Sequence, residues 1–204
     1  MTHNKDHWYD GWFYDKIIAP NQDRIFGEIK NIIQPNSKVI DVGCGTGRLS
    51  FFIADKVEKI VGIDLSKRNI ETANQTLSKK PNSKISFIHT TLSDLISQKH
   101  NYDYAVMTYV IHEVNPDERV QLLNDMAQIA DKIIIGDYLT PSKKGFWNFL
   151  NEVVEFLAGN EHYSNYKHFI ANNGLQSLVN RAGLKVLFEI KNKPVTSQLL
   201  VLSK

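Results

Sequence analysis

The chain has 204 residues, 42% of them hydrophobic, and a formal net charge of +2 from 24 basic and 22 acidic side chains; this composition is typical of one globular domain and disfavours an obligate nucleic-acid-binding protein. The one cysteine excludes an internal disulfide, and with an N-terminus that lacks a secretory pattern it predicts a cytoplasmic location. No apolar run approaches the ~20 residues that span a bilayer, so we expect no integral membrane association.

Short apolar runs alternate with amphipathic segments through the first two thirds of the chain. The runs that read as buried strands are 38–43, 59–65, 84–90, 102–111 and 132–139. Helical spacing appears between them, as at Leu49 and Ile53, and Ser66 is placed to cap the helix after the second strand. Asn115 and Pro116 predict the start of the helix after the fourth strand. Because helical crossovers join parallel strands, this order predicts an α/β fold with helices on both faces of the sheet.

The last third of the chain changes character. A helix is expected within 143–170, where apolar residues form one broad stripe, and another from Leu175 to Arg181. The runs 184–190 and 197–204 flank a proline-containing turn and read as an antiparallel pair. We expect one domain over 1–204, whose parts are an N-terminal lid or helical segment over 1–35 and a helical insertion on the substrate side over 143–182.

The motif that points to chemistry is Asp41-Val42-Gly43-Cys44-Gly45-Thr46-Gly47, where the first strand gives way to a helix. Glycines there let a ligand approach the backbone, and the helix end offers unpaired amides. The dinucleotide fingerprint Gly-x-Gly-x-x-Gly would need a third glycine where this chain has Arg48. Asp64 ends the second strand, where a carboxylate can accept both hydroxyls of a ribose. The pattern favours an adenosine-containing ligand; the alternative is a tight turn followed by a helix-capping acid.

At these motifs the chain resembles the class I S-adenosylmethionine-dependent methyltransferases. VIDVGCGTG is close to the family's first motif, GIDLS to its second and YDYAVMTYVIHEV to its fourth-strand segment, while IIIGDYLTP and RAGL resemble its later part. The resemblance runs from about Asn36 to the C-terminus. It implies a Rossmann-like seven-stranded, mostly parallel sheet with an antiparallel last strand between the fifth and the sixth, and S-adenosyl-L-methionine as the cofactor.

The resemblance also implies a cofactor site. The glycines of the first motif would line the methionine part, Asp64 would bind the ribose hydroxyls, and Leu65 would lie beside the adenine. After the third strand the family often has Gly-Asp-Ala where this chain has Thr90-Thr91-Leu92, so a hydroxyl replaces the carboxylate that meets the adenine amino group. The full expected set is Tyr14, Asp41, Gly43, Cys44, Gly45, Gly47, Asp64, Leu65, Thr91, Leu92 and Thr108.

Two residues after the fourth strand are candidates for catalysis. His112 stands at the sheet edge where ligands bind, so it is placed to act as a general base; alternatively it caps or packs against the next helix. Tyr109 either donates a hydrogen bond in the same crevice or belongs to the core. A base helps when the acceptor is an alcohol, phenol or carbon acid and is dispensable when the acceptor is already nucleophilic. The scattered histidines predict no metal site, and we expect Cys44 to be a small residue rather than a nucleophile.

Aromatic residues gather in two segments, Trp8 to Tyr14 and Phe146 to Phe169. They either wall a substrate pocket, with the first segment as a lid, or form a satellite core. The Asn/Asp-Pro-Pro-aromatic motif of enzymes that methylate amino groups of nucleic acids is replaced by Thr108-Tyr109-Val110-Ile111. We therefore expect a small-molecule acceptor, apolar and lipid-like ones included, and no nucleic acid. The alternatives are a protein-modifying methyltransferase, a non-catalytic module that binds the cofactor, and a nicotinamide-dependent oxidoreductase, which Arg48 disfavours; the oligomeric state stays open.

Overall fold

The computed structural model describes residues 19–98, 101–141, 146–157, 159–192 and 196–204. The strands are β1 (Lys38–Val42), β2 (Lys59–Asp64), β3 (Ile85–His89), β4 (Tyr102–Thr108), β5 (Ala130–Tyr138), β6 (Lys185–Lys191) and β7 (Ser197–Ser203). The helices are α1 (Ala19–Ile32), α2 (Arg48–Ile53), α3 (Lys67–Lys79), α4 (Leu92–Ser97), α5 (Arg119–Ile129), α6 (Phe146–Leu157), α7 (Asn160–Ala171) and α8 (Gly174–Arg181). None of the helices in the described ranges has the length and apolarity that crossing a bilayer requires.

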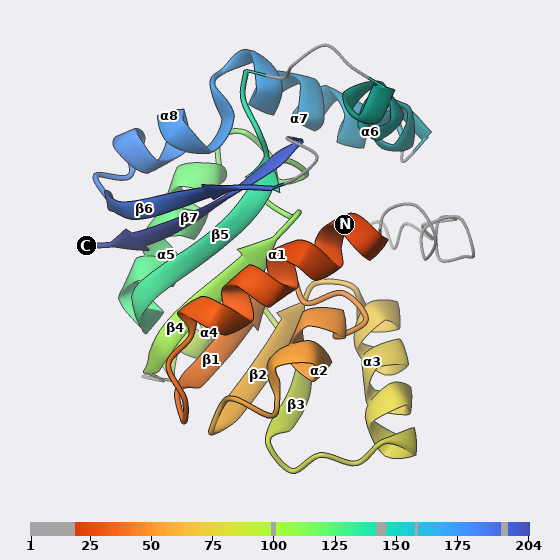
Figure 1. The fold of residues 1–204 in the computed structure, drawn as a ribbon, viewed down its shortest axis with the longest axis vertical. Coiled ribbons are helices and arrows are strands. Elements are labelled where there is room, and N and C mark those ends of the chain that lie inside the picture. Colours follow the sequence, from red (N-terminus) through yellow and green to blue (C-terminus); the bar gives the residue numbers. More distant parts are fainter. Residues whose placement is uncertain (1–18, 99–100, 142–145, 158, 193–195) are drawn as a thin grey trace.

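One sheet with the strand order β3-β2-β1-β4-β5-β7-β6 runs through the centre of the molecule (Figure 1). The first five strands pair in parallel, and β7 is antiparallel to both β5 and β6. The predicted α/β fold, with an antiparallel last strand between the fifth and the sixth, is confirmed. Because β2, β1 and β4 are parallel neighbours, their carboxyl ends meet at one edge of the sheet, and the loops that follow them lie together.

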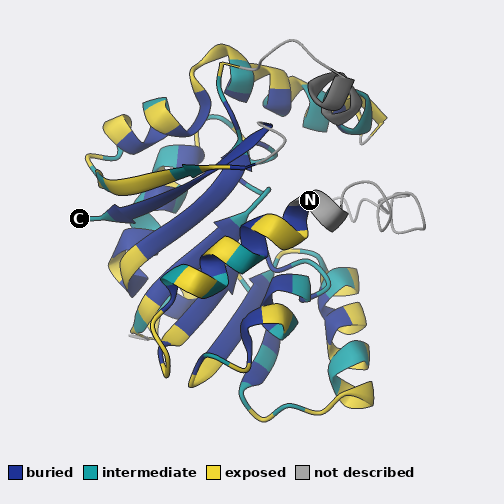
Figure 2. Ribbon diagram, viewed as in Figure 1, coloured by how far each residue is buried: buried dark blue, intermediate teal, exposed yellow. Residues whose placement is uncertain are grey.

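Both faces of the sheet are buried, which is why the central strands read as nearly continuous apolar runs. Along β5, Ile134 belongs to a core cluster covered by α1, α2 and α3, while Ile133 and Ile135 belong to a second cluster covered by α4, α5 and α8. Figure 2 shows the strands as a largely buried layer among these helices. A sheet packed on both faces gives the loops at its edge a rigid base.

Two predicted elements are interrupted in the structure. The strand expected over 102–111 ends at Thr108, because Tyr109 has a φ of 55° and leaves the extended conformation. The helix expected within 143–170 is two helices, α6 and α7, which flank Gly159 with its φ of 118°. The first interruption turns the chain at the end of β4, on the edge of the sheet where β1 and β2 also end.

Helix α5 begins at Arg119, three residues later than the sequence pattern predicts. Asn115 Oδ1 accepts a hydrogen bond from Asp117 N at 3.1 Å, so the Asn-Pro pair starts a separate turn. The buried Arg119 side chain then ties the beginning of α5 to its surroundings. Its guanidinium donates hydrogen bonds to the carbonyls of Val114, His112 and Asn165. The loop after β4 and helix α7 are thereby fixed to each other.

Candidate functional site

The glycine-rich turn between β1 and α2 is anchored to the next strand. The amides of Gly43 and Cys44 both donate to the carbonyl of Ile63, at 2.8 and 2.9 Å. A Cβ at Gly43 would lie 2.6 Å from Cγ2 of Val110, so the turn passes close to the loop after β4. A Cβ at Gly45, which has a φ of 54°, would meet nothing within 4 Å. The turn therefore presents open space at Gly45, where a ligand can approach the backbone.

Asp64, at the end of β2, points its carboxylate at this turn. Its Oδ2 accepts from Gly45 N at 2.8 Å, and its Oδ1 accepts from Ser66 N at 2.7 Å. Ser66 caps α3 by accepting from Asn69 N, so this backbone is fixed as the sequence predicted. Asn69 Nδ2 also donates to Oδ1, at a longer 3.5 Å. A carboxylate offers about four acceptor positions, so these bonds still leave capacity for a further donor.

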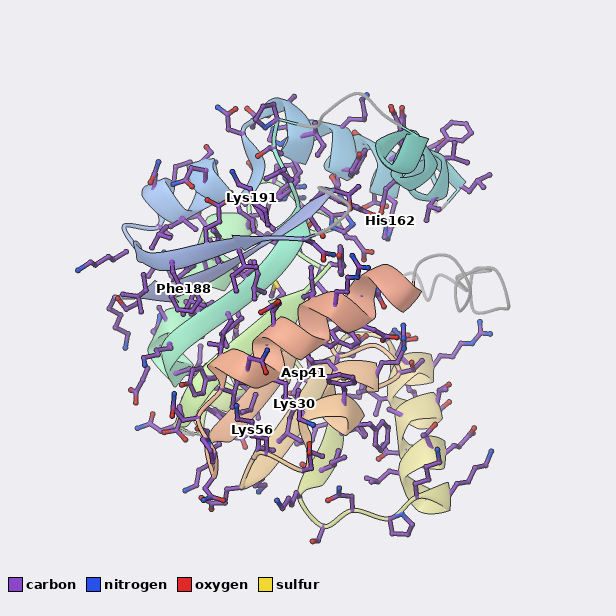
Figure 3. The ribbon with its side chains drawn as sticks, in the orientation of Figure 1. Lys30, Asp41, Lys56, His162, Phe188 and Lys191 are labelled. Atoms are coloured by element: carbon purple, nitrogen blue, oxygen red, sulfur yellow. The ribbon has the colours of Figure 1, made fainter. Side chains whose placement is uncertain are left out.

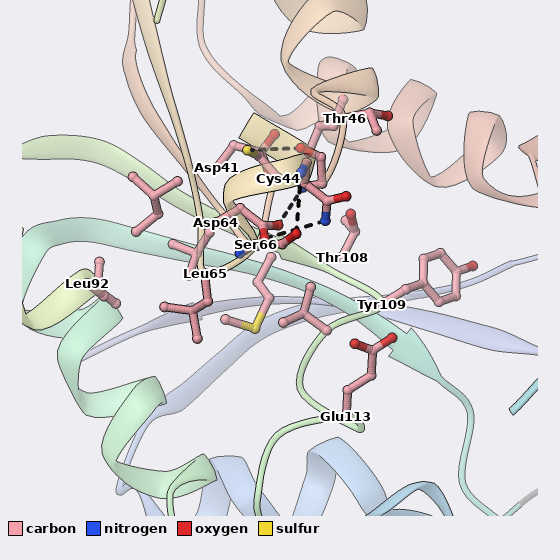
Figure 4. A pocket seen from close by; sticks show the side chains of 18 of the residues that line it. Asp41, Cys44, Thr46, Asp64, Leu65, Ser66, Leu92, Thr108, Tyr109 and Glu113 are labelled. Atoms are coloured by element: carbon pink, nitrogen blue, oxygen red, sulfur yellow. Dashed lines mark hydrogen bonds between the residues drawn. The ribbon is translucent and has the colours of Figure 1, made fainter. Parts of the chain in front are cut away.

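A cavity of about 1090 Å³ opens in front of these residues. The predicted residues that line it are Asp41, Gly43, Cys44, Gly45, Asp64, Leu65, Thr91, Leu92, Thr108 and Tyr109. In Figure 4, Leu65 and Leu92 lie on one side of Asp64, while Tyr109 and Glu113 lie on the other. The structure therefore brings together residues from four separate loops at one end of the sheet.

Two predicted site residues do not line this cavity, and a third is not among the residues that the structure describes. Gly47, with a φ of 84°, faces inward, where a Cβ would overlap the ring of Phe87. A glycine is needed here for close packing against Phe87, not for contact with the cavity. His112 does not line the cavity. Tyr14, with the whole aromatic segment from Trp8, lies outside the described residues.

The apolar end of the cavity carries Leu65 and Leu92. Leu65 is 75% exposed and faces open space beside Asp64, whereas Leu92 is buried at the start of α4. Thr91 forms a capping box with Asp94: Thr91 Oγ1 donates to Asp94 Oδ2 at 2.7 Å and accepts from Asp94 N at 3.2 Å. The Thr91 hydroxyl is thus engaged at the helix end, and Thr91 and Leu92 form a fixed part of the cavity wall.

Burial raises the pKa of two acidic groups of the glycine motif. Asp41 is 2% exposed and accepts a hydrogen bond from Ser50 Oγ at 2.7 Å. Burial raises the pKa of Asp41 to about 7. Burial also raises the pKa of the Cys44 thiol far above its ordinary value, with Asp41 and Asp64 adding to the effect. A thiol that stays protonated is a poor nucleophile, so Cys44 acts as a small residue in the turn.

Tyr109 lines the cavity in an unusual backbone conformation. Its φ of 55° is in the left-handed region, which costs energy for a residue other than glycine and is typical of functional sites. Its amide donates to Gly136 O at 2.8 Å and its hydroxyl to Ser197 Oγ at 3.0 Å. The hydroxyl is therefore tied to β7, and Tyr109 offers the cavity its backbone and ring.

His112 lies beneath the cavity wall, between two acidic side chains. Its Nδ1 is 2.8 Å from Asp137 Oδ1 on β5, and its Nε2 is 3.4 Å from Glu155 Oε1 on α6. Burial alone lowers the pKa of His112, but the charges of Asp137 and Glu155 outweigh it and hold the pKa well above the ordinary 6.5. The imidazole is thus already protonated at neutral pH. An enclosed imidazolium cannot accept a proton from a substrate, so the structure argues against the predicted base role of His112 and favours its packing alternative.

Glu113 and His162 line the cavity and were not among the predicted site residues. Glu113 follows His112 directly, and its side chain is 39% exposed. His162 comes from α7, and Figure 3 shows it on the side of α6 and α7 that faces the rest of the domain. Its Nε2 lies 3.6 Å from Glu113 Oε2. Glu113 could have been predicted as a site residue, because it lies in the loop that follows β4. Nothing local in the sequence marks His162, because it is folding that brings α7 to the cavity.

The sequence matches known methyltransferases. The family model described as a methyltransferase domain matches residues 39–132. A probable S-adenosylmethionine-dependent methyltransferase of Saccharomyces cerevisiae is 24% identical over 72% of this chain and 50% of its own length. A 2-phytyl-1,4-naphtoquinone methyltransferase of a Nostoc species is 29% identical over 67% of this chain and 64% of its own length. The chain thus spans one half to two thirds of these curated relatives.

Solved structures share the fold. The magnesium protoporphyrin IX methyltransferase of Synechocystis with bound S-adenosylhomocysteine aligns with a TM-score of 0.69 at 17% sequence identity. The alignment covers 97% of this chain and 90% of that chain. At this identity the likeness shows a common architecture.

Proposed function

Since the chain belongs to the class I S-adenosylmethionine-dependent methyltransferases, we propose that it transfers the methyl group of S-adenosylmethionine to a small-molecule acceptor held in the same cavity. The cofactor supplies the methyl group on a sulfonium, which is a good leaving group. The protein has to hold the acceptor in line with that group and to exclude water.

The observation that supports this proposal most is the contact of Asp64 with Gly45. The Gly45 amide and the Ser66 amide orient the carboxylate, which borders open space at the turn. Asp64 would accept the ribose hydroxyls with its remaining capacity. Because carboxylate–hydroxyl bonds are charge-assisted, this contact contributes strongly to affinity.

The rest of the cavity fits the same cofactor. Leu65, Thr91 and Leu92 form the apolar wall that would hold the adenine. Thr108, on the opposite side of Asp64 in Figure 4, and Gly43 of the glycine turn would accommodate the methionine part. In this arrangement the reacting methyl group would point toward the part of the cavity near Tyr109 and Glu113.

The cavity has room for an acceptor. Pockets for one ligand commonly measure about 300–1,000 Å³, and this one measures about 1090 Å³. Helix α7 contributes His162 to its wall, in agreement with a substrate-side role for 143–182. The apolar acceptor named for the Nostoc relative makes an apolar or aromatic acceptor reasonable here.

A nicotinamide cofactor fits less well. The third fingerprint position is Arg48, whose guanidinium donates to Gln22 Oε1 and Asp23 Oδ1, both at 2.9 Å. These bonds fix α2 to α1, so the helix start that would receive a pyrophosphate carries a large, anchored side chain. The experiment below distinguishes a small-molecule acceptor from a protein acceptor and from a non-catalytic binding role.

The test combines ligand binding with methyl-transfer products. Calorimetry and thermal unfolding of the full chain are measured with S-adenosylmethionine, S-adenosylhomocysteine and NAD. Isotope-labelled methyl transfer is then followed by mass spectrometry in a metabolite extract and in a protein extract. We expect the two adenosyl compounds to bind and the label to enter small molecules. Label in proteins alone would favour a protein-modifying enzyme, and binding without transfer to either extract would favour a non-catalytic module.

A further inference from the structure

The cavity wall opposite the adenine end contains an acidic and an imidazole side chain that face each other. Resting on the proposed function, we propose that Glu113, paired with His162, is the proton acceptor of the methyl transfer. The acceptor class that this proposal names is a hydroxyl or amine compound, whose nucleophilic atom carries a proton that must leave. Carboxylic acids are nucleophilic without a base, so this site offers them no advantage as acceptors.

The backbone of Glu113 is held from two sides. Its amide donates to Val110 O at 2.9 Å within the turn after β4. Its carbonyl accepts from Asn165 Nδ2 of α7 at 2.8 Å. These bonds fix the point from which the side chain reaches the cavity, where Figure 4 shows it on the side of Tyr109. A general base needs such a fixed position to meet the proton it removes.

The two carboxylate oxygens of Glu113 face different histidines. Oε2 lies 3.6 Å from Nε2 of His162, which lines the cavity and is 13% exposed. Oε1 lies 3.8 Å from Nε2 of His112, the buried cation beneath the wall. His162 and Asn165 are three residues apart on α7 and therefore share one face of that helix. The helix that fixes the backbone of Glu113 thus also supplies its imidazole partner.

The surroundings of Glu113 strengthen it as a base. Burial raises its pKa, the His112 cation lowers it, and the carboxylates of Glu155 on α6, Asp137 on β5 and Asp64 across the cavity raise it further. The net direction is upward. A carboxylate with a raised pKa holds a proton better than one with an ordinary pKa, and the ideal base has a pKa near the working pH. His162 Nε2, 3.6 Å from Glu113 Oε2 and partly exposed, lies where it can pass that proton on toward solvent.

The proposed step balances. A lone pair of the acceptor oxygen or nitrogen forms a bond to the methyl carbon while the carbon–sulfur bond breaks and its electron pair goes to sulfur. The positive charge of the sulfonium is lost, and the proton released by the acceptor goes to a carboxylate oxygen of Glu113. No oxidant, reductant or further reactant is needed. An anionic acceptor would meet repulsion from the carboxylates around Glu113, which is a second reason against acids as acceptors.

The test uses the full chain, with Glu113→Gln and His162→Gln as variants and Glu71→Gln on the exposed face of α3 as the control. Methyl-labelled S-adenosylmethionine is supplied with a panel of phenols, primary amines and benzoic acids. We expect the label to enter phenols or amines, and the labelled class identifies the acceptor atom as oxygen or nitrogen. Glu113→Gln should lower turnover by about 10²–10⁴-fold and abolish its rise with pH, while S-adenosylhomocysteine binds as before. His162→Gln should shift the pH profile, and Glu71→Gln should behave as the wild type.

A second measurement does not depend on turnover. Carbon-13 NMR of labelled glutamate side chains, assigned by the signal missing in Glu113→Gln, gives the titration of Glu113. We expect a midpoint above the ordinary glutamate value of about 4.3. The inference is overturned if Glu113 titrates with an ordinary midpoint, or if the Glu113→Gln variant keeps wild-type turnover. It is also overturned if the label enters only benzoic acids, or enters no phenol or amine. If these results accompany normal binding of S-adenosylhomocysteine, the proposed cofactor function stands; if the wild type binds neither adenosyl compound, that function fails instead.

Discussion

His112 Nδ1 lies 2.8 Å from Asp137 Oδ1, and both side chains are only 1% exposed. With Glu155 Oε1 at 3.4 Å from Nε2, the imidazolium joins the loop after β4 to β5 and to α6. Tyr138 completes the group, because its hydroxyl donates to Glu155 Oε1 at 2.7 Å. The charge of His112 therefore holds α6 and the loop after β4 against the sheet.

Replacing His112 should destabilise the fold. In His112→Ala, Asp137 and Glu155 remain buried without their cation, which typically costs about 3–5 kcal/mol. Urea unfolding of the wild type and the variant measures this loss. His168→Ala, which removes an exposed histidine of α7, is the matched control and should change stability little. Equal losses in the two variants would contradict the assigned role of His112.

The same group predicts a pH dependence of stability. A pKa raised well above 6.5 means that the folded protein binds this proton more tightly than the unfolded chain. The contribution is complete below about pH 6.5 and is lost as the pH rises through the folded-state pKa. We therefore expect the free energy of unfolding to fall on the alkaline side, and to fall less in His112→Gln. A wild-type profile that rises there would overturn the assignment.

Asp41 makes a separate contribution, at lower pH, to the pH dependence of the free energy of unfolding. Its pKa, raised from 3.8 to about 7 in the folded state, also makes stability fall with rising pH, but within that lower window. Asp41→Asn should flatten the profile there and leave its alkaline part unchanged. Comparison of the two variants separates the contributions.

The strands of the sheet could be predicted well, because the residues that identify each strand are neighbours in the sequence. Each strand is an apolar run, and Ser66 caps α3 as its position before the helix indicated. The glycine turn and Asp64 were also found, since the fixed order of strand, turn, helix and strand places them together. His112 was expected to face the ligand crevice but is buried behind the cavity wall, because Asp137 and Glu155, which other elements bring to it, hold it there. His162 was missed for the same reason, because only tertiary packing sets it beside Glu113.

The glycines of the turn should differ in what they tolerate. Gly47→Ala places a methyl group against the Phe87 ring at a φ of 84° and should destabilise the fold. Gly45→Ala meets no protein atom within 4 Å, so its cost is the strain of a φ of 54°, on the order of 1 kcal/mol. Its methyl group would, however, enter the space proposed for the cofactor. We expect Gly45→Ala to fold and to lose S-adenosylhomocysteine affinity in calorimetry; unchanged affinity would place the ligand elsewhere.

The ribose assignment depends on Asp64. Asp64→Ala removes a carboxylate that would bond the ribose and that already accepts from Gly45 N and Ser66 N. Loss of such charge-assisted bonds should weaken S-adenosylhomocysteine binding by about 1.5–3 kcal/mol. Asp64→Asn keeps one acceptor oxygen without the charge and should fall between the wild type and Asp64→Ala.

The controls for this prediction separate binding from disruption of the turn. Asp55→Asn removes an exposed carboxylate that pairs with Lys30, and it should leave the calorimetric affinity unchanged. Melting temperatures without ligand show whether the Asp64 variants keep the fold. If both Asp64 variants are folded and bind S-adenosylhomocysteine as tightly as Asp55→Asn does, the ribose does not contact Asp64. The adenosyl group would then have to bind along another part of the cavity, because Asp64 is the acid that faces the open side of the glycine turn.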